Sequence, residues 1–199
     1  MKQENKWSVR DVITTALLTV LLIVIQLITN MVCMASDFVS MVLSVGITMM
    51  LCAPVYFLMV CRIHKRFVTF VYMTILGLVF LMMGNWYLLP YFMIVGVLCE
   101  LILWKNGWES KKKMTAAWTL ASLLYNGVNL LPLWFFWDTY YDFAIASGME
   151  QSYVESFVHY YTSTGWLLFI LLFTTACGFL GSLIGGKLIN KHFKKAGIL

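Results

Sequence analysis

The first candidates for chemistry are polar side chains that interrupt apolar runs of the sequence. Asn126 and Asn129 stand three positions apart within the apolar run 114–136, so a continuous helix would place both on one face. Asn85 ends an earlier run. A buried amide is costly unless it is hydrogen-bonded. Two functions fit these amides equally well: they hydrogen-bond neighbouring helices, or they orient a small ligand in an apolar pocket.

Aromatic and acidic residues accompany these amides. Segment 138–164 alone holds five of the ten tyrosines and four of the nine acids. Its residues Tyr153, Phe157 and Tyr160 or Tyr161 recur at helical spacing, which predicts an amphipathic helix, either a lid over a pocket or a helix anchored at the membrane interface. The predicted substrate-binding residues are Asn85, Trp86, Asn126, Asn129, Trp134, Trp137, Asp138, Tyr141, His159 and Tyr160.

The sequence offers few residues for catalysis or metal binding. His159 with Asp138 or Asp142 offers possible metal ligands, but without a recognisable spacing. The sequence has no H-E-x-x-H, no G-x-S-x-G, no C-x-x-C and no phosphate-binding loop. We therefore expect no catalytic residue, no metal and no cofactor, and no ATP hydrolysis by this chain. A membrane enzyme using Asp37 and Asp138 is a minor alternative.

The composition sets the architecture that must position these residues. Of the 199 residues, 61% are hydrophobic and 12% are charged, which predicts an all-α integral membrane protein. About 20 apolar residues cross a bilayer. The sequence predicts one transmembrane domain over residues 1–199, with an external segment at 138–164 and six spans at 11–33, 39–61, 67–85, 87–104, 114–136 and 165–187.

Charged and aromatic residues predict the orientation. All fourteen Lys and Arg residues fall before the first run, after the last, or in alternate loops, which places both termini in the cytoplasm. Trp7, Trp104, Trp108 and Trp118 are expected at the inner interface. Ser8 and Asp11 have the spacing of a capping box, which predicts a helix start.

Two features near the inner side have alternative interpretations. Glu100 lies close to the inner end of the fourth run, where we expect an ion pair with Lys105 or another basic neighbour, or a contact with a partner. Gly178, Gly181 and Gly185 share one face of the last run. Such a stripe permits close helix contact, either within this chain or with another membrane subunit.

Several segments, in this order, carry a family resemblance: Arg10–Ile13, Gly84–Tyr87, Glu100–Ile102, Pro132–Tyr141 and Gly185–Ile198. Together they resemble the Trep_Strep or MptA-like family of bacterial membrane proteins, among the substrate-binding S components of energy-coupling factor (ECF) transporters. The resemblance implies a six-helix subunit that captures a small vitamin-like or chelate-like molecule outside the cell. Uptake would then be driven by a transmembrane coupling subunit and two ATPase subunits.

The resemblance also bears on docking and on the ligand. S components dock through small residues of the first helix, often Ala-x-x-x-Ala; here the stretch carries Thr15, Ala16 and Thr19, which departs from that pattern. We expect these three residues, with the glycine stripe, to face the coupling subunit. Since the predicted outer loops lack Lys and Arg, we expect a neutral, aromatic or cationic ligand. A self-sufficient channel or facilitator is the main alternative function.

Overall fold

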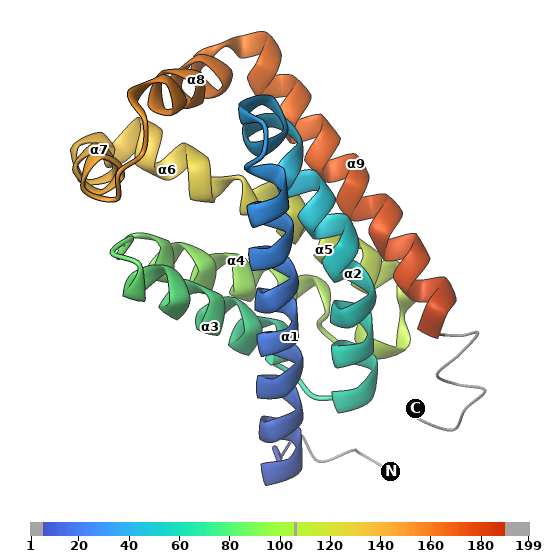
Figure 1. Cartoon of the computed structure of the whole chain (residues 1–199). Helices are drawn as coiled ribbons and strands as arrows, with labels where there is room; N and C mark the ends of the chain where they lie inside the picture. Colours follow the sequence, from blue (N-terminus) through green and yellow to red (C-terminus); the bar gives the residue numbers. More distant parts are fainter. Residues whose placement is uncertain (1–5, 106, 190–199) are drawn as a thin grey trace.

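The computed structural model describes residues 6–105 and 107–189. Most of these residues lie in helices joined by short turns. Figure 1 shows their arrangement. In chain order they are α1 (Val9–Cys33), η1 (Val39–Leu43), α2 (Ser44–Ile63), α3 (Val68–Met82), α4 (Leu88–Ile102), η2 (Gly107–Glu109), α5 (Lys111–Tyr125), α6 (Gly127–Phe135), α7 (Trp137–Ala146), α8 (Gln151–Thr162) and α9 (Thr164–Leu188).

Helices occupy all six predicted positions, but they differ in length. Three segments of 25 residues are long and apolar enough to cross a membrane: Val9–Cys33, Val39–Ile63 and Thr164–Leu188. The run from Lys111 through α7 counts as a fourth if its bent parts form one span. α3 and α4 have 15 residues each, about 22 Å of helix against a hydrocarbon layer of roughly 30 Å. Six full spans and the side of each terminus therefore remain predictions.

The predicted capping box at the start of α1 is present. The Asp11 backbone N–H donates to Ser8 Oγ over 3.2 Å, and the Ser8 backbone N–H donates to Asp11 Oδ2 over 2.9 Å. Two backbone donors that the first turn leaves without helical acceptors are thereby satisfied.

Glu100 fixes the start of α3 from a neighbouring helix. Its carboxylate oxygens accept the backbone N–H of Phe67 over 3.0 Å and that of Thr69 over 2.8 Å. Phe67 has a φ of 70°, so the chain reverses direction just where the carboxylate binds. The carboxylate thus caps a helix whose free N–H groups attract negative charge. The ion pair or partner contact predicted for Glu100 stays a prediction.

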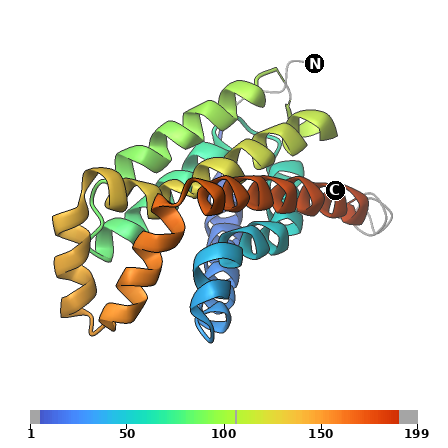
Figure 2. The same ribbon diagram turned by 90° about the horizontal axis from the view of Figure 1, so that it is seen from above.

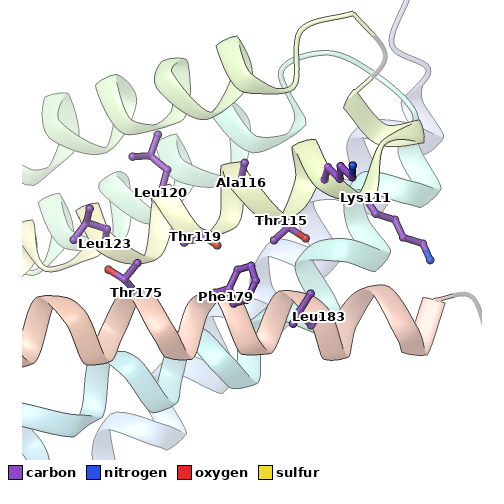
Figure 3. Close-up of a pocket in the computed structure, with 10 residues that line it drawn as sticks. Lys111, Thr115, Ala116, Thr119, Leu120, Leu123, Thr175, Phe179 and Leu183 are labelled. Carbon is purple, nitrogen blue, oxygen red and sulfur yellow. The ribbon is translucent and has the colours of Figure 1, made fainter.

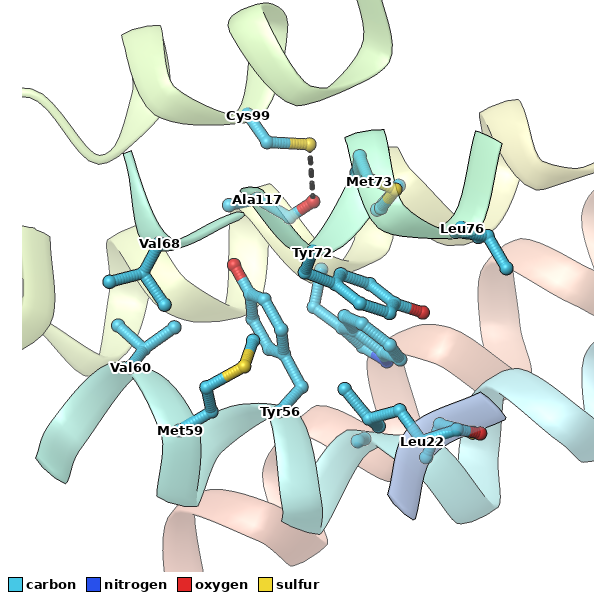
Figure 4. Close-up of a cluster of buried hydrophobic side chains, with 14 of the residues drawn as sticks. Leu22, Tyr56, Met59, Val60, Val68, Tyr72, Met73, Leu76, Cys99 and Ala117 are labelled. Carbon is cyan, nitrogen blue, oxygen red and sulfur yellow. Dashed lines mark hydrogen bonds between the residues drawn. The ribbon is translucent and has the colours of Figure 1, made fainter. Parts of the chain in front are cut away.

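An aromatic stack forms the centre of the bundle (Figure 4). The Trp118 ring stacks on Tyr56 with ring centroids 4.4 Å apart, and its Nε1–H donates to the Met49 carbonyl over 3.1 Å. Trp118 is fully buried, so the prediction that it marks the inner membrane interface is wrong. Burial with a satisfied indole N–H is the other environment that Trp favours.

The glycine stripe of α9 packs within the chain. A Cβ on Gly181 would lie 2.7 Å from the Met50 carbonyl oxygen, and one on Gly185 would lie 3.2 Å from the Ala53 carbonyl oxygen. The Ser122 side chain occupies the corresponding space at Gly178. These contacts bring α9 against α2 and α5 and show close packing inside the chain, the first of the two roles predicted for the stripe.

α7 and α8 form a hairpin at one side of the bundle, which we call the cap (Figures 1 and 2). The Tyr140 and Phe157 rings hold its two helices together with centroids 5.0 Å apart. The buried face of α8 consists of Val154, Phe157 and Tyr161. Phe157 and Tyr161 were predicted for this face, whereas the predicted Tyr153 is half-buried. The cap leads directly into α9.

Candidate ligand-binding site

The helical pattern of the predicted fifth span is interrupted at Asn126, whose backbone angles remain helical (φ −59°, ψ −14°); we call this position the break. α5 ends at Tyr125 and α6 begins at Gly127, where the Tyr91 ring occupies the space that any Cβ would need. The Tyr91 hydroxyl donates to the Leu124 carbonyl over 2.6 Å, so it satisfies an acceptor near the end of α5. Beyond Phe135 the chain bends by 102° into α7. Broken helices at membrane depth commonly line ligand sites in transporters.

Asn126 is fully buried at this break. Its Nδ2 donates to the Leu123 carbonyl over 3.0 Å. Its Oδ1 is buried and has no hydrogen-bond partner within the described residues. Leaving a buried acceptor unsatisfied costs about 1–3 kcal/mol, which a donor on a ligand would recover.

Three neutral polar side chains form a buried network next to this position, which we call the polar trio. Gln26 Nε2 donates to the Tyr72 hydroxyl over 2.8 Å, and the Tyr125 hydroxyl donates to Gln26 Oε1 over 3.2 Å. The trio joins α1, α3 and α5, and Tyr125 directly precedes Asn126. The trio thus brings one amide and two phenols together beside the end of α5, without a charged side chain among them.

Asn129 connects α6 to the cap. Its Nδ2 donates to the Tyr161 hydroxyl over 2.7 Å, and that hydroxyl donates to the Met41 carbonyl in η1 over 2.9 Å. Ser40 and Tyr153 add a second link between η1 and α8, with their hydroxyl oxygens 3.1 Å apart. Burial raises the pKa of Tyr161 well above that of an exposed tyrosine, so its hydroxyl remains a donor.

A second aromatic group joins the cap to the α3–α4 turn. The Tyr87 and Phe136 rings stack with centroids 4.3 Å apart, and Trp86 contacts the edge of Phe136 at 5.3 Å. The Tyr87 hydroxyl donates to Asn85 Oδ1 over 2.8 Å. The predicted residues Asn85 and Trp86 therefore lie together at the edge of the cap, as part of this aromatic contact.

The family of the chain follows from comparison with known proteins. The model of the Trep_Strep family, described as a hypothetical bacterial integral membrane protein, matches residues 9–195. The chain belongs to the Trep_Strep family. It is thus an integral protein of a bacterial membrane. No curated protein and no solved structure matched.

The remaining predicted ligand residues of this Trep_Strep protein lie apart from the break. Trp134 is 56% exposed and lines an open apolar groove of about 460 Å³ with Tyr91, Gly127 and Leu167. Trp137 packs on Tyr140 and Tyr141 within the cap. The others lie on or near the surface of the cap: exposed Asp138, Tyr141 and His159, and Tyr160 between Phe38 and Trp166.

The structure also constrains docking by the Trep_Strep chain through α1. Thr15 and Thr19 are buried inside the chain, where Thr19 Oγ1 lies 3.9 Å from Met59 Sδ. Both side chains are therefore inaccessible to a second subunit in this conformation. Only Ala16 of the three predicted docking residues is exposed, on a face that it shares with Leu17 and Val20.

Sequence reasoning missed the polar trio of this Trep_Strep protein. Gln26 is the one amide within the apolar stretch from Val12 to Thr29, so the signal was present. Tyr72 and Tyr125 carry no such signal, because tyrosine is common in apolar helices. Among the described residues, no group of three or more His, Cys, Asp or Glu side chains is placed to hold a metal ion.

Proposed function

We propose that this Trep_Strep protein is the substrate-specific capture subunit of an ECF-type importer. It binds a small nutrient molecule at the break between α5 and α6 and beneath the cap. A transmembrane coupling subunit and two ATPase subunits then supply the energy for uptake. The protein itself catalyses no reaction in this account.

The observation that carries the proposal is the unpaired, fully buried Oδ1 of Asn126. Among the amide side chains in the described part of the chain, only that of Asn126 keeps a buried oxygen without a partner. The amide also stands where the pattern of the helix is interrupted between α5 and α6, directly after Tyr125 of the polar trio. An unsatisfied buried polar group is costly, and costs of this kind concentrate at functional sites.

The side chains at the break define the class of ligand. Asn126 offers an acceptor, and the hydrogen-bonded tyrosines and Gln26 offer neutral donors and acceptors. We place the apolar part of the ligand against the stacked rings of Tyr87 and Phe136 at the edge of the cap. We therefore infer a neutral, vitamin-like molecule with at least one hydrogen-bond donor and an aromatic or apolar body.

Purification of the tagged, full-length chain from its own bacterium in mild detergent tests the proposal. We expect a membrane subunit and two ATPase subunits to co-purify, and vesicles with this complex to accumulate ligand only with ATP. Recovery of the chain without such partners would contradict the proposal. Flux through liposomes containing the chain alone would indicate a channel instead. A hydrolytic activity lost in Asp37→Asn and Asp138→Asn would indicate an enzyme.

A further inference from the structure

A groove of about 700 Å³ runs along the surface between α5 and α9 (Figure 3). Its walls extend from Lys111 to Leu123 on α5 and from Thr175 to Leu183 on α9. The two helices touch near both ends. The Ser122 side chain contacts Gly178, and a Cβ on Gly186 would lie 3.9 Å from Lys111 Cδ. The residues of the candidate ligand-binding site do not line this groove.

The groove is apolar along its length and basic at one end. Leu120, Phe179 and Leu183 line it, and Phe179 and Leu183 remain 46% and 43% exposed. The side chains of Lys111 and Lys112 are exposed at the basic end. Within residues 6–105 and 107–189, neither lysine side chain has a hydrogen bond or an ion pair. A molecule that fits this surface has an anionic head and an apolar tail.

The position of the lysines strengthens the case for an anion. Lys111, Lys112 and Lys113 form the first turn of α5, which contains no acid. Positive charges in a first turn oppose the helix dipole, and an anion there removes the conflict. Lys113 is directed elsewhere, since its Nζ donates to the Lys105 carbonyl over 3.3 Å. Lys111 and Lys112 are left to bind the anion.

The length of the groove matches one leaflet of a bilayer. From Lys111 to Leu123 the helix rises about 18 Å, whereas half of the hydrocarbon layer is roughly 15 Å. Thr115 lies one turn beyond Lys111, at the depth where a glycerol ester would follow a head group. The inner leaflet carries the anionic lipids, and the basic residues predict that this end of α5 faces it.

We propose that this groove binds one anionic phospholipid. The phosphate lies between Lys111 and Lys112 at the start of α5, and an acyl chain lies along Leu120, Phe179 and Leu183. This site is separate from the capture site, and it stands whether or not the chain works in an importer. The lipid holds α5 and α9 together on the face where side chains leave space between them.

Lipid retention tests the proposal. The full-length protein is reconstituted with equal amounts of phosphatidylcholine and phosphatidylglycerol, extracted in mild detergent, and its bound lipids are counted by native mass spectrometry. We expect the wild type to retain phosphatidylglycerol preferentially, and Lys111→Gln/Lys112→Gln to lower its retention about tenfold. The control Lys105→Gln/Lys187→Gln removes the same charge outside the groove and leaves retention unchanged.

Equal retention of both lipids by the wild type would overturn the proposal, as would equal losses in the two double variants. Ala116→Phe tests the groove itself, because it fills the space for the acyl chain while both lysines remain. We expect this variant to lose phosphatidylglycerol while its unfolding temperature stays within a few degrees of the wild type. Unchanged retention of phosphatidylglycerol by Ala116→Phe would show that the lipid binds near the lysines without its acyl chain in the groove, and would contradict the proposal.

Discussion

Asn126 and Asn129 lie three positions apart, but they form different contacts. Asn129 donates through Nδ2 to the Tyr161 hydroxyl and thereby ties α6 to the cap. Asn126 keeps a buried oxygen unpaired. The sequence placed both on one face and left two functions open, bonds between helices or contact with a ligand; in the structure the two residues have different surroundings. We therefore assign the ligand contact to Asn126 and the positioning of the cap to Asn129.

Glu100 permits a stability prediction at the scale of one residue. Glu100→Gln keeps the shape of the side chain but removes the charge that attracts the two N–H groups of α3. One amide oxygen cannot replace two carboxylate acceptors, so we expect the free energy of unfolding to fall by about 1–3 kcal/mol. Unfolding in a detergent titration measures this loss.

Exposed Glu109 provides the control for Glu100. Glu109→Gln removes the same charge in the same region and should change the free energy of unfolding by less than about 0.5 kcal/mol. Equal effects of the two substitutions would show that Glu100 acts only through the net charge of the inner side and would contradict its role as a cap of α3.

Residue-scale prediction succeeded where one local pattern decided the outcome. Ser8 and Asp11 form the predicted capping box, because that motif depends only on neighbours in the chain. Trp118 failed because its environment depends on Tyr56 of another helix, and nothing in the local sequence distinguishes a buried Trp from an interfacial one. Tyr72 and Tyr125 were not predicted as members of the polar trio for the same reason, because their partners lie on other helices.

At the scale of elements, the contact between α9 and α2 depends on glycine. A methyl group on Gly181 would lie 2.7 Å from a backbone oxygen, which cannot move independently of α2. We expect Gly181→Ala to lower the free energy of unfolding by about 1–3 kcal/mol. Gly165 of the same helix has no atom within 4 Å of its Cβ position.

The matched substitution Gly165→Ala should therefore have the opposite sign. Replacing an open helical glycine raises the free energy of unfolding by about 0.5–1 kcal/mol. Thermal unfolding of both variants in one detergent gives the comparison. A stabilising effect of Gly181→Ala would contradict the close packing of α9 on α2.

Tyrosine hydroxyl groups hold the cap to η1, so replacing one tyrosine by phenylalanine tests this contact while the ring stays in place. Tyr161→Phe removes the donor to the Met41 carbonyl and the acceptor of Asn129 while keeping the ring. We expect hydrogen exchange in α8 to accelerate about tenfold or more, with little change in α2. Tyr160→Phe is the control, since its hydroxyl has no hydrogen bond in the part of the chain that the structure describes. Similar acceleration in both variants would contradict the role of the Tyr161 hydroxyl.

Element positions were predictable, whereas their breaks were not. Apolar runs identified helices at all six places, because a membrane segment must satisfy its own backbone hydrogen bonds. The short lengths of α3 and α4 and the break at Asn126 depend on tertiary contacts, such as the Tyr91 ring against Gly127. Hydropathy averages over about 20 residues cannot resolve a single residue of this kind.

At the scale of the whole molecule, the polar groups separate into two regions with different chemistry. The neutral polar trio lies beside the end of α5, where Asn126 follows Tyr125. The lysines gather at the far end of α5, where the groove to α9 begins. The proposed capture role and the proposed lipid site thus rest on different parts of the molecule.

The central claim is that Asn126 Oδ1 accepts a hydrogen bond from a small neutral ligand. The decisive measurement is the amount of small molecule that co-purifies with the wild type, with Asn126→Leu, and with the control Asn30→Leu, which removes an exposed amide of α1. We expect the wild type and Asn30→Leu to retain the same molecule and Asn126→Leu to retain about tenfold less, with an unfolding temperature no lower than that of the ligand-free wild type. Equal retention in Asn126→Leu, or no retained molecule in the wild type, would contradict the account.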